Sequence, residues 1–349
     1  MKKRIVVVGL GSIGRRHARL LADRGDLDVE WCEVSPAMEQ LARTEMSAPR
    51  QIYRDYAEVI SSAPDYVLIA TPQNHHCHQA NSALNAGIPV LCEKPLSDNL
   101  ADAKKIAACV METGVPLAVG FQSHFSDPHV RLREIVRSGA IGQVRHFHCR
   151  VGTYLTLQNS RSRYQSQMFG ALIQDYSHQP DLAFWILGEI PTAAHARGLT
   201  SRRPKLWAEP NVLSVDSVYA GDTLGTLHLN YLQMPQRHHY EIVGDDGWVF
   251  LDADTGQLQI GDRKTNRVAH EDHAVERDLL YRREHEAFFD AAAGKRPPES
   301  SAADGLVSAA FADATLTSLQ TGEPAALESL DPEDSGTRRR LNISSMKIF

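Results

Sequence analysis

The chain has 349 residues, of which 42% are hydrophobic and 23% are charged, as expected for a globular protein of about two domains. Its 37 basic residues are outnumbered by 43 acidic ones, and the net charge of −6 argues against a nucleic-acid-binding protein. The sequence lacks an apolar run long enough to span a membrane, and its five cysteines form no CxxC pair, so we expect a reduced, cytoplasmic protein.

The first third of the sequence alternates short β-branched runs with helical patterns. The predicted strands are residues 4–9, 28–34, 66–70, 88–92 and 115–120. The predicted helices are residues 13–24, 36–46, 75–86 and 98–113. The cationic start and the first apolar run are interpreted as a strand rather than a secretory signal, because glycines interrupt the run. Residues 1–122 are therefore predicted to form an α/β Rossmann domain with a doubly wound parallel sheet.

A glycine-rich GxGxxG turn connects the first predicted strand to the first predicted helix. Gly9 permits the tight turn, Gly11 lets a diphosphate approach the backbone, and Gly14 allows the helix to pack closely on the strand. The N–H groups of Ser12 and Ile13 lie at the positive end of the helix dipole, where an anion binds. The strand–turn–helix context predicts a dinucleotide site. The alternative is a glycine-rich turn in a domain without a ligand.

An acidic residue follows this turn at the spacing that the dinucleotide fingerprint requires. Glu33 ends the second predicted strand, where its carboxylate can accept hydrogen bonds from a ribose diol and repel a 2′-phosphate. The sequence therefore predicts NAD as the cofactor. NADP is less favoured. It stays open as an alternative because Glu30 and Arg43 can alter the local electrostatic field.

The pattern changes after about residue 122, where strands begin to predominate. The predicted strands are residues 144–155, 212–219, 223–233, 239–252 and 257–261, with a turn at 245–247. The predicted helices are residues 128–137, 178–187, 277–293 and 302–320. We predict that residues 123–330 form an α+β domain with an open, mostly antiparallel sheet that binds substrate and supports oligomerisation. Residues 331–349 are predicted to be a poorly packed tail.

Four further segments carry motifs in a recognisable order. They read ATPQNHHCH at 70–78, CEKPL at 92–96, IVRSGAIG at 135–142 and QDYSHQPD at 174–181. In this order the chain resembles the Gfo/Idh/MocA oxidoreductases, the glucose–fructose oxidoreductase and inositol dehydrogenase family, from residue 4 to about 325. The resemblance implies hydride transfer between nicotinamide and a secondary alcohol of a sugar, inositol or sugar derivative. It also implies a homodimer or homotetramer that pairs through the open sheet.

The EKP segment and the segment around residue 178 carry the residues that the resemblance assigns to catalysis. Lys94 lies at the junction of cofactor and substrate, with Glu93 beside it, and the Lys94–Pro95 bond is commonly cis in the family. His178 matches the histidine that exchanges the proton of the substrate hydroxyl. The family's aspartate usually stands four residues earlier, but here Gln174 has that position and the carboxylate is Asp175.

Other positions are predicted to contact the cofactor or the substrate. The segment after the strand at 66–70 supplies the predicted cofactor contacts Thr71, Pro72, Asn74 and His76. Further substrate contacts are predicted for Gln122, Arg163 and Tyr164. The run 75–78 reads HHCH, but consecutive residues cannot all face one ion, so we expect no metal site.

The predicted residues suit the oxidation of an alcohol, which needs a hydride acceptor and a base. A histidine such as His178 exchanges protons near neutral pH, and the Lys94 ammonium can polarise the reacting oxygen. Each residue also has a structural alternative: Lys94 as a surface lysine, His178 as a polar helix end, and Asp175 as an N-cap. Two other functions stay open, namely glycoside cleavage by transient oxidation and elimination, and NAD-responsive binding without catalysis.

Overall fold

The computed structural model describes residues 2–160 and 164–327. These residues divide into two compact units. The first contains residues 2–125 and Glu276–Ala309, and the second contains the remaining described residues. Residues 276–309 thus group with the N-terminal part of the chain, whereas the sequence analysis placed them in the domain 123–330. The predicted tail, 331–349, lies outside the described residues.

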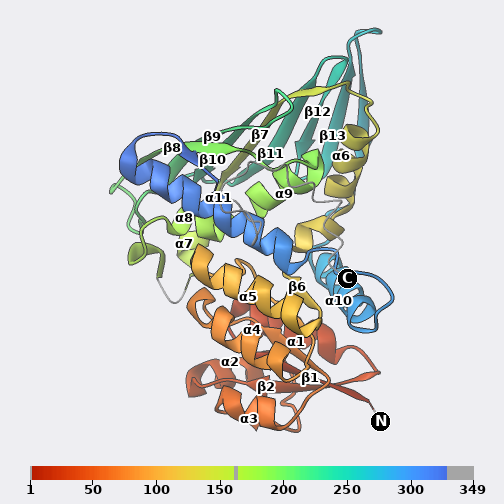
Figure 1. Ribbon diagram of the computed structural model, residues 1–349, viewed down its shortest axis with the longest axis vertical. Coiled ribbons are helices and arrows are strands. Elements are labelled where there is room, and N and C mark those ends of the chain that lie inside the picture. The colour runs from red at the N-terminus through yellow and green to blue at the C-terminus, as the bar shows by residue number, and fades with distance from the viewer. Residues whose placement is uncertain (1, 161–163, 328–349) are drawn as a thin grey trace. The chain divides into compact units, whose positions relative to one another are not determined.

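The first unit is built on a parallel sheet of six strands in the order β3-β2-β1-β4-β5-β6 (Figure 1). The strands are β1 (Lys3–Val8), β2 (Leu27–Cys32), β3 (Ile52–Tyr53), β4 (Tyr66–Ile69), β5 (Val90–Cys92) and β6 (Leu117–Val119). Its helices are α1 (Ser12–Ala22), α2 (Pro36–Glu45), α3 (Tyr56–Ser61), α4 (His76–Asn85), α5 (Leu100–Thr113) and α10 (Arg277–Ala292). Two 3₁₀ turns, η1 (Gln73–His75) and η2 (Gln122–Phe125), follow β4 and β6. The predicted Rossmann sheet is confirmed, with β3 and α3 as additional elements.

The strand order of this sheet determines where a ligand can bind. The chain winds outward from β1 in both directions, through β2 on one side and β4 on the other. In doubly wound sheets, ligands bind outside the carboxyl ends of the strands at this switch point. The loops that follow β1, β4, β5 and β6 therefore leave the sheet at the edge where a ligand is expected.

Helix α10 completes the core of the first unit. Phe288 on α10 joins the same buried apolar cluster as Val7 of β1 and Leu21 of α1. Ion pairs reinforce the contact, since Arg19 on α1 lies 2.6 Å from Asp278 on α10. The burial of this apolar face explains why α10 groups with the first unit although it is distant in sequence.

The second unit contains a sheet of nine strands in the order β14-β13-β12-β11-β7-β10-β9-β8-β15. The strands are β7 (Val144–Gly152), β8 (Ala193–Leu199), β9 (Val212–Val218), β10 (Leu224–Asn230), β11 (Arg237–Gly244), β12 (Gly247–Asp252), β13 (Gln257–Asp262), β14 (Arg267–Asp272) and β15 (Ala325–Ala326). Among the described strands of this second sheet, only β7 and β10 pair in parallel. The predicted mostly antiparallel sheet is confirmed. The sequence analysis did not anticipate β8, β14 and β15.

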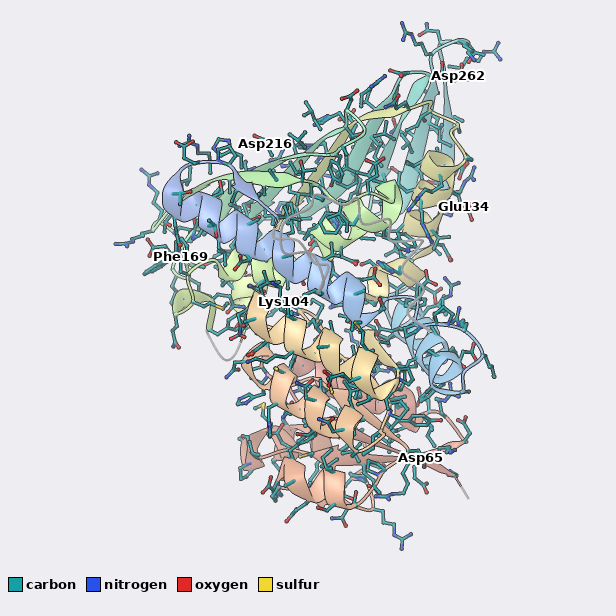
Figure 2. The ribbon with its side chains drawn as sticks, in the orientation of Figure 1. Asp65, Lys104, Glu134, Phe169, Asp216 and Asp262 are labelled. Atoms are coloured by element: carbon teal, nitrogen blue, oxygen red, sulfur yellow. The ribbon has the colours of Figure 1, made fainter. Side chains whose placement is uncertain are left out.

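One face of this sheet is covered and the other is open. On β9, Leu213 and Val215 are buried, while Ser214 and Asp216, which alternate with them, are exposed. Figure 2 labels Asp216. The helices of the unit are α6 (Asp127–Arg137), α7 (Leu155–Asn159), α8 (Ala171–Asp175), α9 (His178–Leu187) and the second half of α11 (Ala302–Thr321), with a 3₁₀ turn η3 (Tyr164–Ser166).

Among the described helices of the whole chain, none is long and apolar enough to cross a membrane.

Candidate active site

The turn after β1 contains glycines with two different roles. Gly9 has φ of +88°, and a Cβ there would lie 2.9 Å from the carbonyl oxygen of Ala70. A Cβ on Gly14 would overlap the carbonyl oxygen of Gly9. A Cβ on Gly11, however, would meet no described heavy atom within 4 Å. The fold therefore requires Gly9 and Gly14, whereas Gly11 leaves open space beside the backbone, as the approach of a diphosphate needs.

The first turn of α1 faces this open space. Helix α1 begins at Ser12, and among the described residues no side chain caps it and no acidic residue stands in its first turn. Its leading N–H groups and positive dipole end therefore suit an anion. Ser12 and Ile13, both predicted to bind the cofactor, lie in this turn.

Glu33 lies directly after β2 and contacts the glycine turn. Its carboxylate oxygens accept hydrogen bonds from the backbone N–H groups of Leu10 and Ser35, both at 2.7 Å. Glu33 is buried and held against the turn by these two bonds. A carboxylate that still has free lone pairs can accept further bonds from hydroxyl groups. The turn, the helix end and the carboxylate together fit a dinucleotide with a ribose diol.

Glu30 and Arg43, which left the choice between NAD and NADP open in the sequence, pair with residues other than Glu33. Glu30 binds Arg4 across the sheet at 3.0 Å. Arg43 binds Glu39 within α2 at 2.8 Å. Neither side chain is therefore an unpaired charge next to Glu33.

The loop after β4 contains the four predicted cofactor contacts. Thr71 donates a hydrogen bond to the Gln79 side chain at 2.6 Å, and Pro72 and Asn74 are exposed. His76 is buried, with its ring nitrogens each 2.9 Å from a backbone carbonyl oxygen, those of Thr71 and Pro95. Burial lowers the pKa of His76, so the ring is neutral and donates to one carbonyl at a time. His76 thus connects the loop after β4 with the EKP loop.

The EKP residues follow β5 without a gap, and the Lys94–Pro95 bond is cis. Glu93 is buried, and one of its oxygens accepts the backbone N–H of Lys94 at 3.1 Å. Lys94 itself is half-buried. Gln122 begins the turn η2 after β6 and is also half-buried. The fold therefore places the glycine turn, the loop at 71–76, Lys94 and Gln122 at the carboxyl ends of neighbouring strands.

The second unit holds two of the predicted catalytic residues, Asp175 and His178, at the junction of α8 and α9. Asp175 is the last residue of α8 and His178 is the first residue of α9. Asp175 accepts hydrogen bonds from the Tyr231 hydroxyl and, at 3.2 Å, from the Gln165 amide. Burial, followed by the charge of Asp175, raises the pKa of Tyr231 far above its usual range, so Tyr231 remains a neutral donor.

Asp175 does not cap α9, because Ser177 occupies the N-cap position. Its two hydrogen bonds instead give its carboxylate a fixed orientation. Sequence reasoning did not identify Tyr231 and Gln165, since no local motif marks either residue.

The remaining predictions concern Arg163, Tyr164 and the absence of a metal site in the HHCH run. Tyr164 begins η3 and is half-buried, whereas Arg163 lies outside the described residues. In the HHCH run, His75 and His78 are exposed while His76 is buried. No group of three or more metal-ligating side chains is present in the described part of the chain.

Comparison with known proteins decides the family. A model described as an oxidoreductase family with an NAD-binding Rossmann fold matches residues 3–121, and a GFO/IDH/MocA C-terminal domain model matches residues 129–250. The chain belongs to the Gfo/Idh/MocA family. This membership confirms the resemblance and agrees with the geometry of the glycine turn, which fits a dinucleotide. The protein is a Gfo/Idh/MocA oxidoreductase that uses a nicotinamide cofactor.

Several relatives match almost the whole chain. Inositol 2-dehydrogenase 1 of Saccharopolyspora erythraea is 27% identical over 338 residues, covering 95% of this chain and 98% of that protein. Inositol 2-dehydrogenase of Rubrobacter xylanophilus is 28% identical, covering 93% of each. The crystal structure of scyllo-inositol dehydrogenase from Lactobacillus casei, with NAD(H) and scyllo-inositol, has a TM-score of 0.80 and 20% identity, covering 94% of this chain and 100% of that chain. At 20% identity, the structural likeness concerns the fold.

Proposed function

We propose that this protein is an NAD-dependent dehydrogenase that oxidises a secondary alcohol of an inositol or a similar cyclic polyol or sugar. The observation that carries the proposal is the open space at Gly11 beside the anchored Glu33 carboxylate, on the same sheet edge as Lys94. The inositol 2-dehydrogenases that match almost the full length of the chain support the choice of substrate class.

The protein's own residues supply the proton chemistry in this proposal, and the nicotinamide, when bound, accepts the hydride. The Lys94 ammonium donates a hydrogen bond to the substrate oxygen and stabilises the negative charge that develops there. His178 takes the hydroxyl proton. Asp175, oriented by Tyr231 and Gln165, accepts a hydrogen bond from a neighbouring hydroxyl of the substrate.

We further propose that NAD is preferred over NADP. A 2′-phosphate would meet the Glu33 carboxylate and needs nearby cations to offset that repulsion. Among the described residues, Arg54 donates to the backbone carbonyl of Glu33, and both Arg54 and Arg43 pair with the carboxylate of Glu39. Their charge is thus partly neutralised before any phosphate arrives.

Turnover by variants tests the assignment. Purified protein is mixed with NAD and a panel of inositols and hexoses, and the absorbance of reduced nicotinamide is followed. Lys94→Met and His178→Asn should each lower kcat/KM by about 10²- to 10⁴-fold, the usual contribution of acid–base assistance. Lys104→Met, on α5 (Figure 2), is the matched control and should keep the rate of the unaltered protein. Full turnover by both site variants would refute these roles.

We also propose a homodimer or homotetramer that pairs through the open face of the second-unit sheet. Val218, Leu224 and Val243 are 51%, 56% and 38% exposed on this face, and Val218 lies opposite Leu224 on the neighbouring strand. Large apolar side chains exposed on a sheet favour pairing with a second copy. Light scattering should give a multiple of the subunit mass, and Leu224→Glu should lower it. A monomeric unaltered protein would contradict the proposal.

We place the protein in the cytoplasm. Each of its five cysteines, all within the described residues, is a free thiol, and Cys32, Cys92, Cys109 and Cys149 are buried. Burial raises the pKa of Cys32 to about 12, so this thiol is unreactive at neutral pH. Free thiols of this kind are typical of a reducing compartment.

A further inference from the structure

A buried polar chain lies behind Lys94 in the first unit, and neither the glycine turn nor the proposed proton transfer uses it. His17 on α1 has Nε2 2.9 Å from Oε1 of Glu93 and Nδ1 2.7 Å from Nε2 of His285 on α10. His17, Glu93 and His285 are 0%, 8% and 2% exposed. The three side chains therefore join α10, α1 and the end of β5 without access to bulk water.

The chemistry of the partners determines the direction of the bonds. Glu93 can only accept while it is ionised, so His17 carries a proton on Nε2 and donates it to the carboxylate. Burial lowers the pKa of His285 far below its usual value, so His285 is neutral. Its Nε2 either donates to His17 or accepts from it, and in both arrangements His17 is held by two hydrogen bonds.

A second buried carboxyl, that of Glu284, is influenced by the charge of Glu93. Glu284 on α10 is 2% exposed, and neither of its oxygens has a hydrogen-bond partner among the described residues. Burial, followed by the charge of Glu93, raises the pKa of Glu284 well above its usual value. Glu284 is therefore a neutral acid, and it adds no second negative charge next to Glu93.

The other end of the chain contacts the backbone of Lys94. The second carboxylate oxygen of Glu93 accepts the Lys94 N–H at 3.1 Å. A Cβ on Gly120, after β6, would lie 3.2 Å from Oε1 of Glu93, so the glycine leaves room for the carboxylate in this orientation. The Glu93 carboxylate is therefore held by hydrogen bonds from His17 and from the Lys94 N–H, and Gly120 leaves room for it.

We propose that the His285–His17–Glu93 chain positions Lys94, and that His17 and His285 are positioning residues for the alcohol oxidation. The inference rests on the proposed function, in which Lys94 contacts the reacting oxygen. Apolar side chains would fill this interior at a lower desolvation cost than polar ones. The polar chain is therefore better explained by the hydrogen bond that its last member, Glu93, accepts from the Lys94 N–H. His17 lies one turn after Gly14, so the helix that faces the diphosphate also anchors Glu93.

Steady-state kinetics test the positioning role. His17→Ala should lower kcat by about 10- to 100-fold, because small displacements of a catalytic group are that costly. The affinity for NADH should stay within about threefold, because the glycine turn is intact. His17→Gln, whose amide can donate to Glu93, should restore most of kcat. Tyr281→Phe is the control, because its ring, 5.0 Å from that of His17, is retained. Unchanged kcat in His17→Ala, or no rescue by His17→Gln, would overturn the inference.

Hydrogen exchange gives a readout that does not depend on turnover. In the unaltered protein the Lys94 amide is bonded to Glu93, so it should exchange slowly, whereas in His17→Ala the freed carboxylate should let it exchange at least about tenfold faster. Equal rates in the two proteins would refute the positioning role even if the enzyme oxidises polyols. The Lys94 amide could exchange faster in His17→Ala while no polyol supports the reduction of NAD by the unaltered protein. That outcome would refute the proposed function and leave the positioning of Lys94 supported.

Discussion

The two glycines that flank Ser12 and Ile13 have separable roles, and substitution distinguishes them. Gly11→Ala adds a methyl group to open space and should leave the melting temperature unchanged while weakening NADH binding by about tenfold or more. Gly14→Ala places a methyl group against the carbonyl of Gly9 and should destabilise the protein by about 1–3 kcal/mol. Calorimetric titration and thermal melts measure the two effects. A destabilised Gly11→Ala with normal affinity would contradict this division.

The preference for NAD is a residue-scale property of Glu33. Glu33→Gln removes the charge that repels a 2′-phosphate, so the ratio of kcat/KM for NAD to that for NADP should fall about tenfold. Glu30→Gln is the matched control, since Glu30 pairs with Arg4 instead. Initial rates with both cofactors provide the ratio. An unchanged ratio in Glu33→Gln would show that other groups select the cofactor.

The sequence could point to candidate site residues where the motif is local, and not where the contact is between distant positions. The glycine turn and the EKP tripeptide are short sequence patterns that each follow a predicted strand, so they can be recognised from contiguous residues. The bond from His17 to Glu93 spans 76 positions, and the bond from Tyr231 to Asp175 spans 56. Only the folded structure brings such pairs together, so no spacing in the sequence indicates them.

At the scale of elements, helices and buried strands were predicted better than short or exposed strands. The short strand β3 and the largely exposed β14 offer little hydrophobic pattern to detect. Helix α10 was predicted as a helix but assigned to the second domain, because chain order places it there. Its polar residues Glu284 and His285 are buried, which blurs the amphipathic pattern that would indicate its packing face.

The buried Glu284 makes a pH-dependent prediction for α10. Its raised pKa means that the folded protein keeps a proton that the unfolded chain loses above about pH 4.3. Glu284 therefore destabilises the fold increasingly as pH rises from that value toward the raised pKa. Glu284→Gln removes this penalty, so its melting temperature should exceed that of the unaltered protein by more at pH 8 than at pH 5.

A neighbouring residue provides the control for this experiment. Glu286, on the same helix, is largely exposed and pairs with Arg24. Glu286→Gln should show no stabilisation that grows with pH, because an exposed carboxylate keeps its contact with water when the chain folds. A gain for Glu284→Gln that is equal at both pH values would contradict the assigned neutral state.

At the scale of the whole molecule, the alternation of elements predicted both sheets correctly. Parallel pairing follows from strands separated by helices, and antiparallel pairing follows from strands separated by tight turns such as residues 245–246. The sequence could not show that Glu276–Ala309 groups with the first unit, because that grouping depends on apolar burial between distant segments.

The central claim is that a hydride passes from a carbinol carbon to nicotinamide, and isotope transfer measures it most directly. The protein is incubated with NAD and inositols or hexoses that carry deuterium on their carbinol carbons, and the reduced cofactor is analysed by mass spectrometry and NMR. The account predicts one deuterium at C4 of the nicotinamide ring with at least one of these substrates, and far slower labelling with Lys94→Met. Reduced cofactor without deuterium, or no reduced cofactor with any substrate of the panel, would contradict it.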